Sequence, residues 1–107
     1  MELIDKHSNQ LLKLCDRFHV IELYVFGSVA TGSTRPDSDV DLLVEFGNVD
    51  IENYFDNYLE FKASLEKLFK RKVDLLEKQT LKNPILIKSI NRNKRKLYER
   101  ADTEMAL

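Results

Sequence analysis

The sequence predicts an α/β fold of the α+β type, a small mixed β-sheet with helices packed on it. Two β-rich runs, at residues 21–26 and 39–46, are separated by a polar connection, and a third lies at residues 72–76. Amphipathic helical patterns stand before, between and after these runs. A chain of 107 residues allows one small domain, which we expect to cover residues 1–100 and to end in a disordered tail at residues 101–107.

Residues 2–17 carry apolar side chains at helical spacing, which predicts an amphipathic helix that covers the sheet. Cys15 lies in this apolar stripe and is the chain's only cysteine, so we expect a buried structural thiol, with no disulfide and no zinc cluster. The sequence has no apolar run of the ~20 residues that a membrane span needs, and no signal peptide at its start. We therefore expect a cytoplasmic protein.

The first two β-rich runs are expected to pair as antiparallel strands. Apolar side chains alternate with others in the first run, and the second is almost continuously apolar after its opening positions. The connection between them, residues 27–38, is only as long as the shortest parallel crossovers, which favours an antiparallel pair. Antiparallel pairing places Gly27 and Ser28, which follow the first strand, beside Asp39 and Asp41, which open the second.

Asp39 and Asp41 predict a metal site. Side chains two positions apart on a strand share a face, so the two residues lie roughly 6–7 Å apart along the backbone. Their carboxylates repel each other unless a cation sits between them, and Mg²⁺ prefers such oxygen ligands. At the neighbouring turn, Gly27 lets a phosphate approach the backbone, while the Ser28 hydroxyl and free N–H groups favour anions. This is the layout needed to hold a metal-bound nucleoside triphosphate.

The polar connection between the two strands is rich in turn residues. Arg35 lies in it and is within reach of a triphosphate, although a solvated loop arginine is the simpler interpretation. Asp37 is interpreted as a turn residue and not as a ligand.

Residues 49–71 carry the longest helical pattern, with an aromatic stripe that we interpret as core packing. Crossovers of this length are right-handed and deliver the next strand parallel to the previous one. The strand at residues 72–76 would then bring Asp74 towards Asp39 and Asp41, although one charged residue on a short edge strand means little by itself.

Asn83 and Pro84 predict the start of the last helix, because Asn is a good N-cap and Pro fits the first helical position. We expect this helix to run into the basic segment at residues 91–96, and Leu97 and Tyr98 to anchor its end. Basic residues dominate the second half of the chain, which indicates a solvated face, an acidic protein partner or nucleic acid.

The glycine–serine turn is followed after ten residues by the pair Asp39 and Asp41. This pattern resembles the GS-x10-D-x-D signature of the nucleotidyltransferase superfamily with a DNA-polymerase-β-like palm. The surrounding run is most similar to the minimal nucleotidyltransferases called MNT domains. The resemblance covers residues 23–46 and extends more weakly into the last helix. One departure is Thr31, which stands where many relatives carry a basic residue before the second glycine.

The resemblance implies a palm-like fold and the transfer of AMP from ATP to a hydroxyl group of a partner HEPN-domain toxin. The implied acceptor is a tyrosine, the implied cofactors are two Mg²⁺ ions, and the chain would act as an antitoxin. The implied catalytic and metal-binding acids are Asp39, Asp41 and Asp74. The expected phosphate-binding residues are Gly27 and Ser28, with Arg35 able to replace the missing basic contact.

Two functions of other classes remain open at this point. The chain can neutralise its toxin by stoichiometric binding without catalysis, although a masking protein has no need of three convergent acids. It can also bind nucleic acid through its basic second half. The acidic first half and the net charge of -1 argue against nucleic acid as the main partner.

Overall fold

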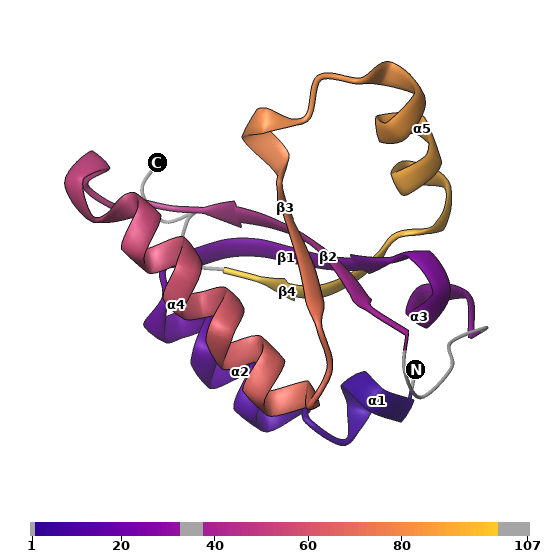
Figure 1. The fold of residues 1–107 in the computed structure, drawn as a ribbon, viewed down its shortest axis with the longest axis horizontal. Helices are drawn as coiled ribbons and strands as arrows, with labels where there is room; N and C mark the ends of the chain where they lie inside the picture. The colour runs from indigo at the N-terminus through magenta and orange to yellow at the C-terminus, as the bar shows by residue number, and fades with distance from the viewer. Residues whose placement is uncertain (1, 33–37, 101–107) are drawn as a thin grey trace.

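Four strands form one mixed sheet in the order β3-β2-β1-β4 (Figure 1). The computed structural model describes residues 2–32 and 38–100, so the expected tail at residues 101–107 lies outside the described part. Strands β1 and β2 pair antiparallel, and β3 pairs with β2 in parallel, which confirms both predicted pairings and the α+β fold class. The strands are β1 (Val20–Phe26), β2 (Val40–Phe46), β3 (Val73–Glu77) and β4 (Arg95–Glu99).

Two helices, α2 and α4, lie side by side across one face of the sheet, and α5 stands on the other side (Figure 1). None of the described helices is long and apolar enough to cross a membrane. The helices are α1 (Glu2–Asp5), α2 (Ser8–Arg17), α3 (Gly27–Thr31), α4 (Ile51–Phe69) and α5 (Pro84–Asn93), with a 3-10 turn η1 (Lys78–Thr80).

The single helix predicted for residues 2–17 is wrong in one respect, because the structure divides it into α1 and α2. His7 stands at the break with φ -114° and ψ 13°, outside helical geometry. Its ring packs edge-on against Phe69 at the end of α4, with the ring centroids 5.7 Å apart. This contact joins residues far apart in the chain, so helical periodicity alone does not reveal the break.

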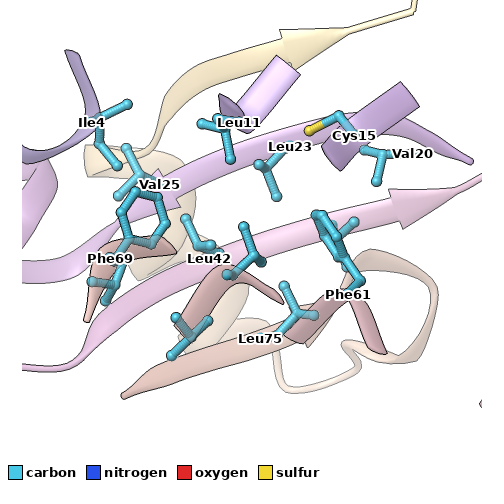
Figure 2. Packing of buried hydrophobic residues seen from close by; sticks show 14 of the residues in the cluster. Ile4, Leu11, Cys15, Val20, Leu23, Val25, Leu42, Phe61, Phe69 and Leu75 are labelled. Atoms are coloured by element: carbon cyan, nitrogen blue, oxygen red, sulfur yellow. The ribbon is translucent and has the colours of Figure 1, made fainter. Parts of the chain in front are cut away.

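The hydrophobic core fills the space between the sheet and the helices α2 and α4 (Figure 2). Leu23 and Leu42 reach it from the central strands, and Phe61 reaches it from α4; all three are almost completely buried. Cys15 lies fully buried in the same cluster, and burial raises the pKa of its thiol to about 12. The prediction that Cys15 is buried is confirmed.

The aromatic stripe of α4 is only partly core, which corrects the sequence interpretation. Phe61 and Phe69 are buried, but Phe55 is 68% exposed and Ile51 is 91% exposed. Positions 51, 55 and 59 are four apart and therefore share one helical face, and in the structure this face points to solvent. The pattern of apolar residues wraps around the helix, and only packing decides which part of it meets the sheet.

The chain after α5 forms a fourth strand that the sequence analysis missed. Asn83 caps α5 as predicted, accepting hydrogen bonds from the backbone N–H groups of Ile85 (3.0 Å) and Leu86 (3.4 Å). The helix ends at Asn93 and does not continue through the basic segment. Residues Arg95–Glu99 instead pair antiparallel with β1 as the edge strand β4. Charged residues are common on sheet edges, because they discourage pairing with other chains.

Candidate functional site

Asp41 and Asp74 lie opposite each other on the neighbouring strands β2 and β3, on the sheet face away from the core. They occupy the same level of the parallel ladder between β2 and β3. Each is followed by a leucine, Leu42 or Leu75, that belongs to the buried core. Because side chains alternate along a strand, the two carboxylates emerge on the other face. The crossover through α4 therefore brings the acid of β3 to the acid of β2, as the sequence predicted.

Asp39 completes a group of three acids. It lies two residues before Asp41, just ahead of β2, and both Asp39 and Asp74 are exposed to solvent. Burial raises the pKa of the Asp41 carboxyl group above its ordinary value, and the negative charges of Asp74 and Asp39 raise it further. Asp39 and Asp74 thus both lie close enough to Asp41 for their charges to act on its carboxyl group.

The three carboxylates repel one another, and a cation would have to draw them together. Within residues 2–32 and 38–100, no group of three or more Asp, Glu, His or Cys side chains is arranged to hold a metal ion as it stands. The donor chemistry still suits a hard divalent cation, because the group consists of carboxylate oxygens. Burial is the main cause of the raised pKa of Asp41, and a positive charge beside it would offset the repulsion from Asp74 and Asp39 that raises this pKa further.

Gly27 packs directly against Asp41. Its φ of +71° lies in the left-handed region that side-chain-bearing residues rarely adopt. A Cβ atom added at this position would collide with Oδ2 of Asp41 and lie 3.2 Å from its Cγ. Glycine is therefore required here twice, once for the backbone turn from β1 into α3 and once for the space that the carboxylate occupies.

Ser28 and Thr31 lie in α3, beside the acids. Ser28 is half-buried in the first turn of the helix, next to Gly27. The Thr31 hydroxyl donates hydrogen bonds to the carbonyl oxygens of Gly27 and Ser28, both at 3.3 Å. Thr31 therefore stabilises the helical turn of α3. Arg35 and Asp37, also considered from the sequence, lie outside the described residues.

A polar network on the same sheet face was missed by the sequence analysis. The Tyr24 hydroxyl donates to Glu22 at 3.2 Å, and Lys78 Nζ lies 3.2 Å from the other Glu22 oxygen and 3.6 Å from Glu45. Lys94 Nζ lies 4.4 Å above the centre of the Tyr24 ring. Alternation along β1 indicates that Glu22 and Tyr24 share a face, but nothing local predicts that the two lysines meet them there.

This network changes how two of its members titrate. Burial by itself raises the pKa of Glu22, yet the hydrogen bond and charge of Lys78 leave that pKa below its ordinary value. The hydrogen bond to Glu22 raises the pKa of Lys78 in turn. The pair is thus held ionised at neutral pH, and it fixes η1 against the face that carries the acids.

The Asp41→Asn variant is expected to be more stable than the wild type at neutral pH when divalent cations are absent. The folded state raises the pKa of Asp41, so this residue's contribution to stability is fully present below its unfolded pKa and is lost as pH rises through its folded pKa. The advantage of the variant should therefore be absent below about pH 3.8 and grow above it. Urea unfolding in EDTA across this range measures it, and a difference independent of pH would contradict the expectation.

The chain matches one protein family along most of its length. Residues 7–98 match the family described as nucleotidyltransferase domain. A protein of Methanocaldococcus jannaschii named "putative protein adenylyltransferase" is 42% identical over 91 residues, which make up 83% of this chain and 85% of that relative. A solved structure described as a "putative minimal nucleotidyltransferase" is 33% identical, covers 88% of this chain and 92% of its own, and has a TM-score of 0.72.

A further solved structure is similar in fold. It contains a tri-AMPylated HEPN toxin of Shewanella oneidensis in complex with MNT antitoxin. The similarity has a TM-score of 0.63 at 17% identity and covers 95% of this chain and 77% of that one. At this identity, the likeness shows a shared fold and no more.

Proposed function

This chain belongs to the nucleotidyltransferase domain family and is a nucleotidyltransferase, and we propose that it transfers AMP from ATP to a hydroxyl group of a partner HEPN-domain toxin. The acceptor on this proposal is a tyrosine, and the chain acts as an antitoxin. AMP as the transferred group is supported by the protein adenylyltransferase of Methanocaldococcus jannaschii. The partner is supported by the AMPylated toxin in the complex of similar fold.

One observation carries the proposal. Asp41 and Asp74 come from strands joined by a long crossover, yet they stand at the same level of one ladder, with Asp39 close enough to raise the Asp41 pKa. Gly27 brings the turn after β1 into contact with the same carboxylate. A scaffold that needed only stability would not gather three like charges, because each raises the cost of ionising the others.

The residues fit a divalent metal, and we propose two Mg²⁺ ions held by Asp39, Asp41 and Asp74. When bound, Mg²⁺ would neutralise negative charge on the phosphates and stabilise the charge that develops during transfer. Gly27 and Ser28 would hold the outer phosphates, through backbone N–H groups and the serine hydroxyl, and so orient the pyrophosphate as the leaving group.

The chemical step forms one bond and breaks another. The acceptor oxygen bonds to the α-phosphorus, the bond from that phosphorus to the bridging α–β oxygen breaks, and pyrophosphate leaves. Asp74 is exposed on the edge strand β3, so it can face the acceptor and take the proton of the attacking hydroxyl group. Arg35 is proposed as a further phosphate contact on the sequence argument alone. Because the reaction draws on ATP, we keep the cytoplasm as its expected location.

An open site suits an acceptor that belongs to another macromolecule. Asp39 and Asp74 are both exposed, so a hydroxyl group on a protein surface can reach them without an opening motion. Basic residues dominate the second half of the chain. They provide a surface that complements an acidic partner.

Two positions of label test the proposal. The chain is incubated with Mg²⁺, with a HEPN-domain toxin, and with ATP labelled at either the α- or the γ-phosphate. We expect the partner to retain label from the α-phosphate only, on a tyrosine that peptide mapping identifies. Label from the γ-phosphate, or none from either, would contradict AMP transfer. Full neutralisation of the partner without ATP would support masking instead.

A further inference from the structure

A cavity opens on the same sheet face as the three acids, and the reaction proposed above assigns it no role. Its volume is about 290 Å³. Strand β2 provides its floor, α5 provides one wall, and the segment around η1 provides another. The lining residues are Leu43, Lys78, Leu81, Ile87, Asn91 and Lys94.

The cavity lies next to the acids along strand β2. Leu43 is two residues after Asp41 on β2, so both side chains point to the same face, and their backbone positions are roughly 6–7 Å apart. Tyr24 is the cross-strand partner of Leu43, as Phe26 is of Asp41. A ligand whose phosphate lies at Asp41 can therefore extend along β2 into this cavity.

Helix α5 is fixed in place as the cavity wall. It stands on the side of the sheet away from α2 and α4 (Figure 1), and it packs against α3, the helix that begins at Gly27. Asn83 caps the first turn of α5, and Ile90, a residue of the same helix, is buried. The helix beside the expected phosphate position, α3, therefore contacts the helix that lines the cavity, α5. This contact fixes the distance between the phosphate site and the cavity.

The chemistry of the lining is that of a site for a flat, partly apolar group. Leu43, Leu81 and Ile87 are aliphatic. Lys78 is engaged by Glu22 and Glu45, and Lys94 lies over the Tyr24 ring. The Asn91 carboxamide makes no hydrogen bond to any part of the chain that the structure describes. It therefore offers one donor and one acceptor to a ligand.

We propose that this cavity receives the adenine base of the nucleotide and that Asn91 reads its edge. The inference rests on the proposed function for the position of the phosphates. A carboxamide pairs in two places with the N6 amino group and N7 of adenine, whereas guanine presents two acceptors at the corresponding edge. The volume is near the lower limit of small-molecule sites and suits a base without its ribose and phosphates.

Direct binding measurements test the inference independently of catalysis. The full chain is titrated with ATP, GTP and inorganic tripolyphosphate in the presence of Mg²⁺ and without any acceptor. We expect the wild type to prefer ATP over both other ligands. Asn91→Leu should weaken ATP binding about ten-fold or more, the loss typical of one bidentate base contact, and leave tripolyphosphate binding unchanged.

A second variant should change the preference in the opposite direction. Asn91→Arg offers donors only, which suit the two acceptors, N7 and O6, that guanine presents at the same edge, so GTP should be bound more tightly relative to ATP than by the wild type. Asn93→Leu is the matched control, because Asn93 lies on the same helix, is exposed and does not line the cavity. It should bind all three ligands as the wild type does, and melting curves verify that each variant is folded.

The outcomes separate this inference from the proposed function. Equal binding of ATP and GTP by the wild type, unaltered ATP binding in both Asn91 variants, or no nucleotide binding at all would overturn the adenine site. AMP transfer that continues alongside such a result would leave the proposed function standing. Base-selective binding without AMP transfer to any HEPN protein would support the site and count against the reaction.

Discussion

Replacing Asp41 by asparagine is expected to reduce the rate of AMP transfer by about a hundred- to a thousand-fold or more, the loss typical of removing one group that stabilises transition-state charge. Burial raises the pKa of Asp41, and the negative charges of Asp74 and Asp39 raise it further, so Asp41 interacts with both of the other acids. The carboxamide is nearly the same size, so the variant should fold. Initial rates at saturating ATP and Mg²⁺ measure the effect.

The control for this prediction is Asp56→Asn, which changes the same chemical group on the exposed part of α4, on the opposite side of the sheet. It should retain wild-type activity. Melting curves add a second readout, because Mg²⁺ should raise the melting temperature of the wild type more than that of Asp41→Asn. If Asp41→Asn were as active as the wild type and Asp56→Asn, Asp41 would have no part in the chemistry.

Gly27→Ala is expected to abolish most of the activity and also to weaken the fold. The new methyl group would collide with the Asp41 carboxylate, which would then have to leave its present position. The backbone at φ +71° is also unfavourable for alanine, and we expect the free energy of unfolding to fall by more than about 1 kcal/mol. Urea unfolding and the rate of AMP transfer, measured on the same preparation, give the two effects.

Gly32→Ala is the control that separates two effects of Gly27→Ala, the collision with Asp41 and the strain of a positive φ. Gly32 has a similar φ of +79°, but a Cβ atom there would meet nothing within 4 Å in the described part of the chain. This variant should lose about 1 kcal/mol of stability through its backbone alone and keep most of its activity. Equal activity in the two glycine variants would mean that the contact between Gly27 and Asp41 has no functional importance.

The face that carries Asp41 and Asp74 was largely predictable because its determinants are local. The connection between β1 and β2 is close to the shortest that a parallel crossover allows, which favours antiparallel pairing, and this pairing brings Gly27 to Asp41. The long helix α4 requires a parallel return, and this brings Asp74 to the same place. Both steps follow from chain length and handedness, and neither depends on which side chains pack against which.

Other features depend on contacts between distant parts of the chain. The residues 95–99 are charged enough to suit a helix or a loop, and only the free edge of β1 makes them a strand. Phe55 and Phe61 look alike in the sequence, and only the position of the sheet decides that one is exposed and the other buried. Lys94 and Tyr24 are likewise brought together by the return of the chain along β1.

The sequence by itself therefore determined the order of the first three strands, the meeting of the three acids and the glycine beside them. Chain connectivity restricts these features to very few arrangements, whatever the side chains do. The tertiary structure alone decided the fourth strand, the outward face of α4 and the cavity between Leu43 and Asn91. For each of these features, the local sequence suits more than one conformation about equally well. Which conformation forms is decided by contacts with distant parts of the folded chain.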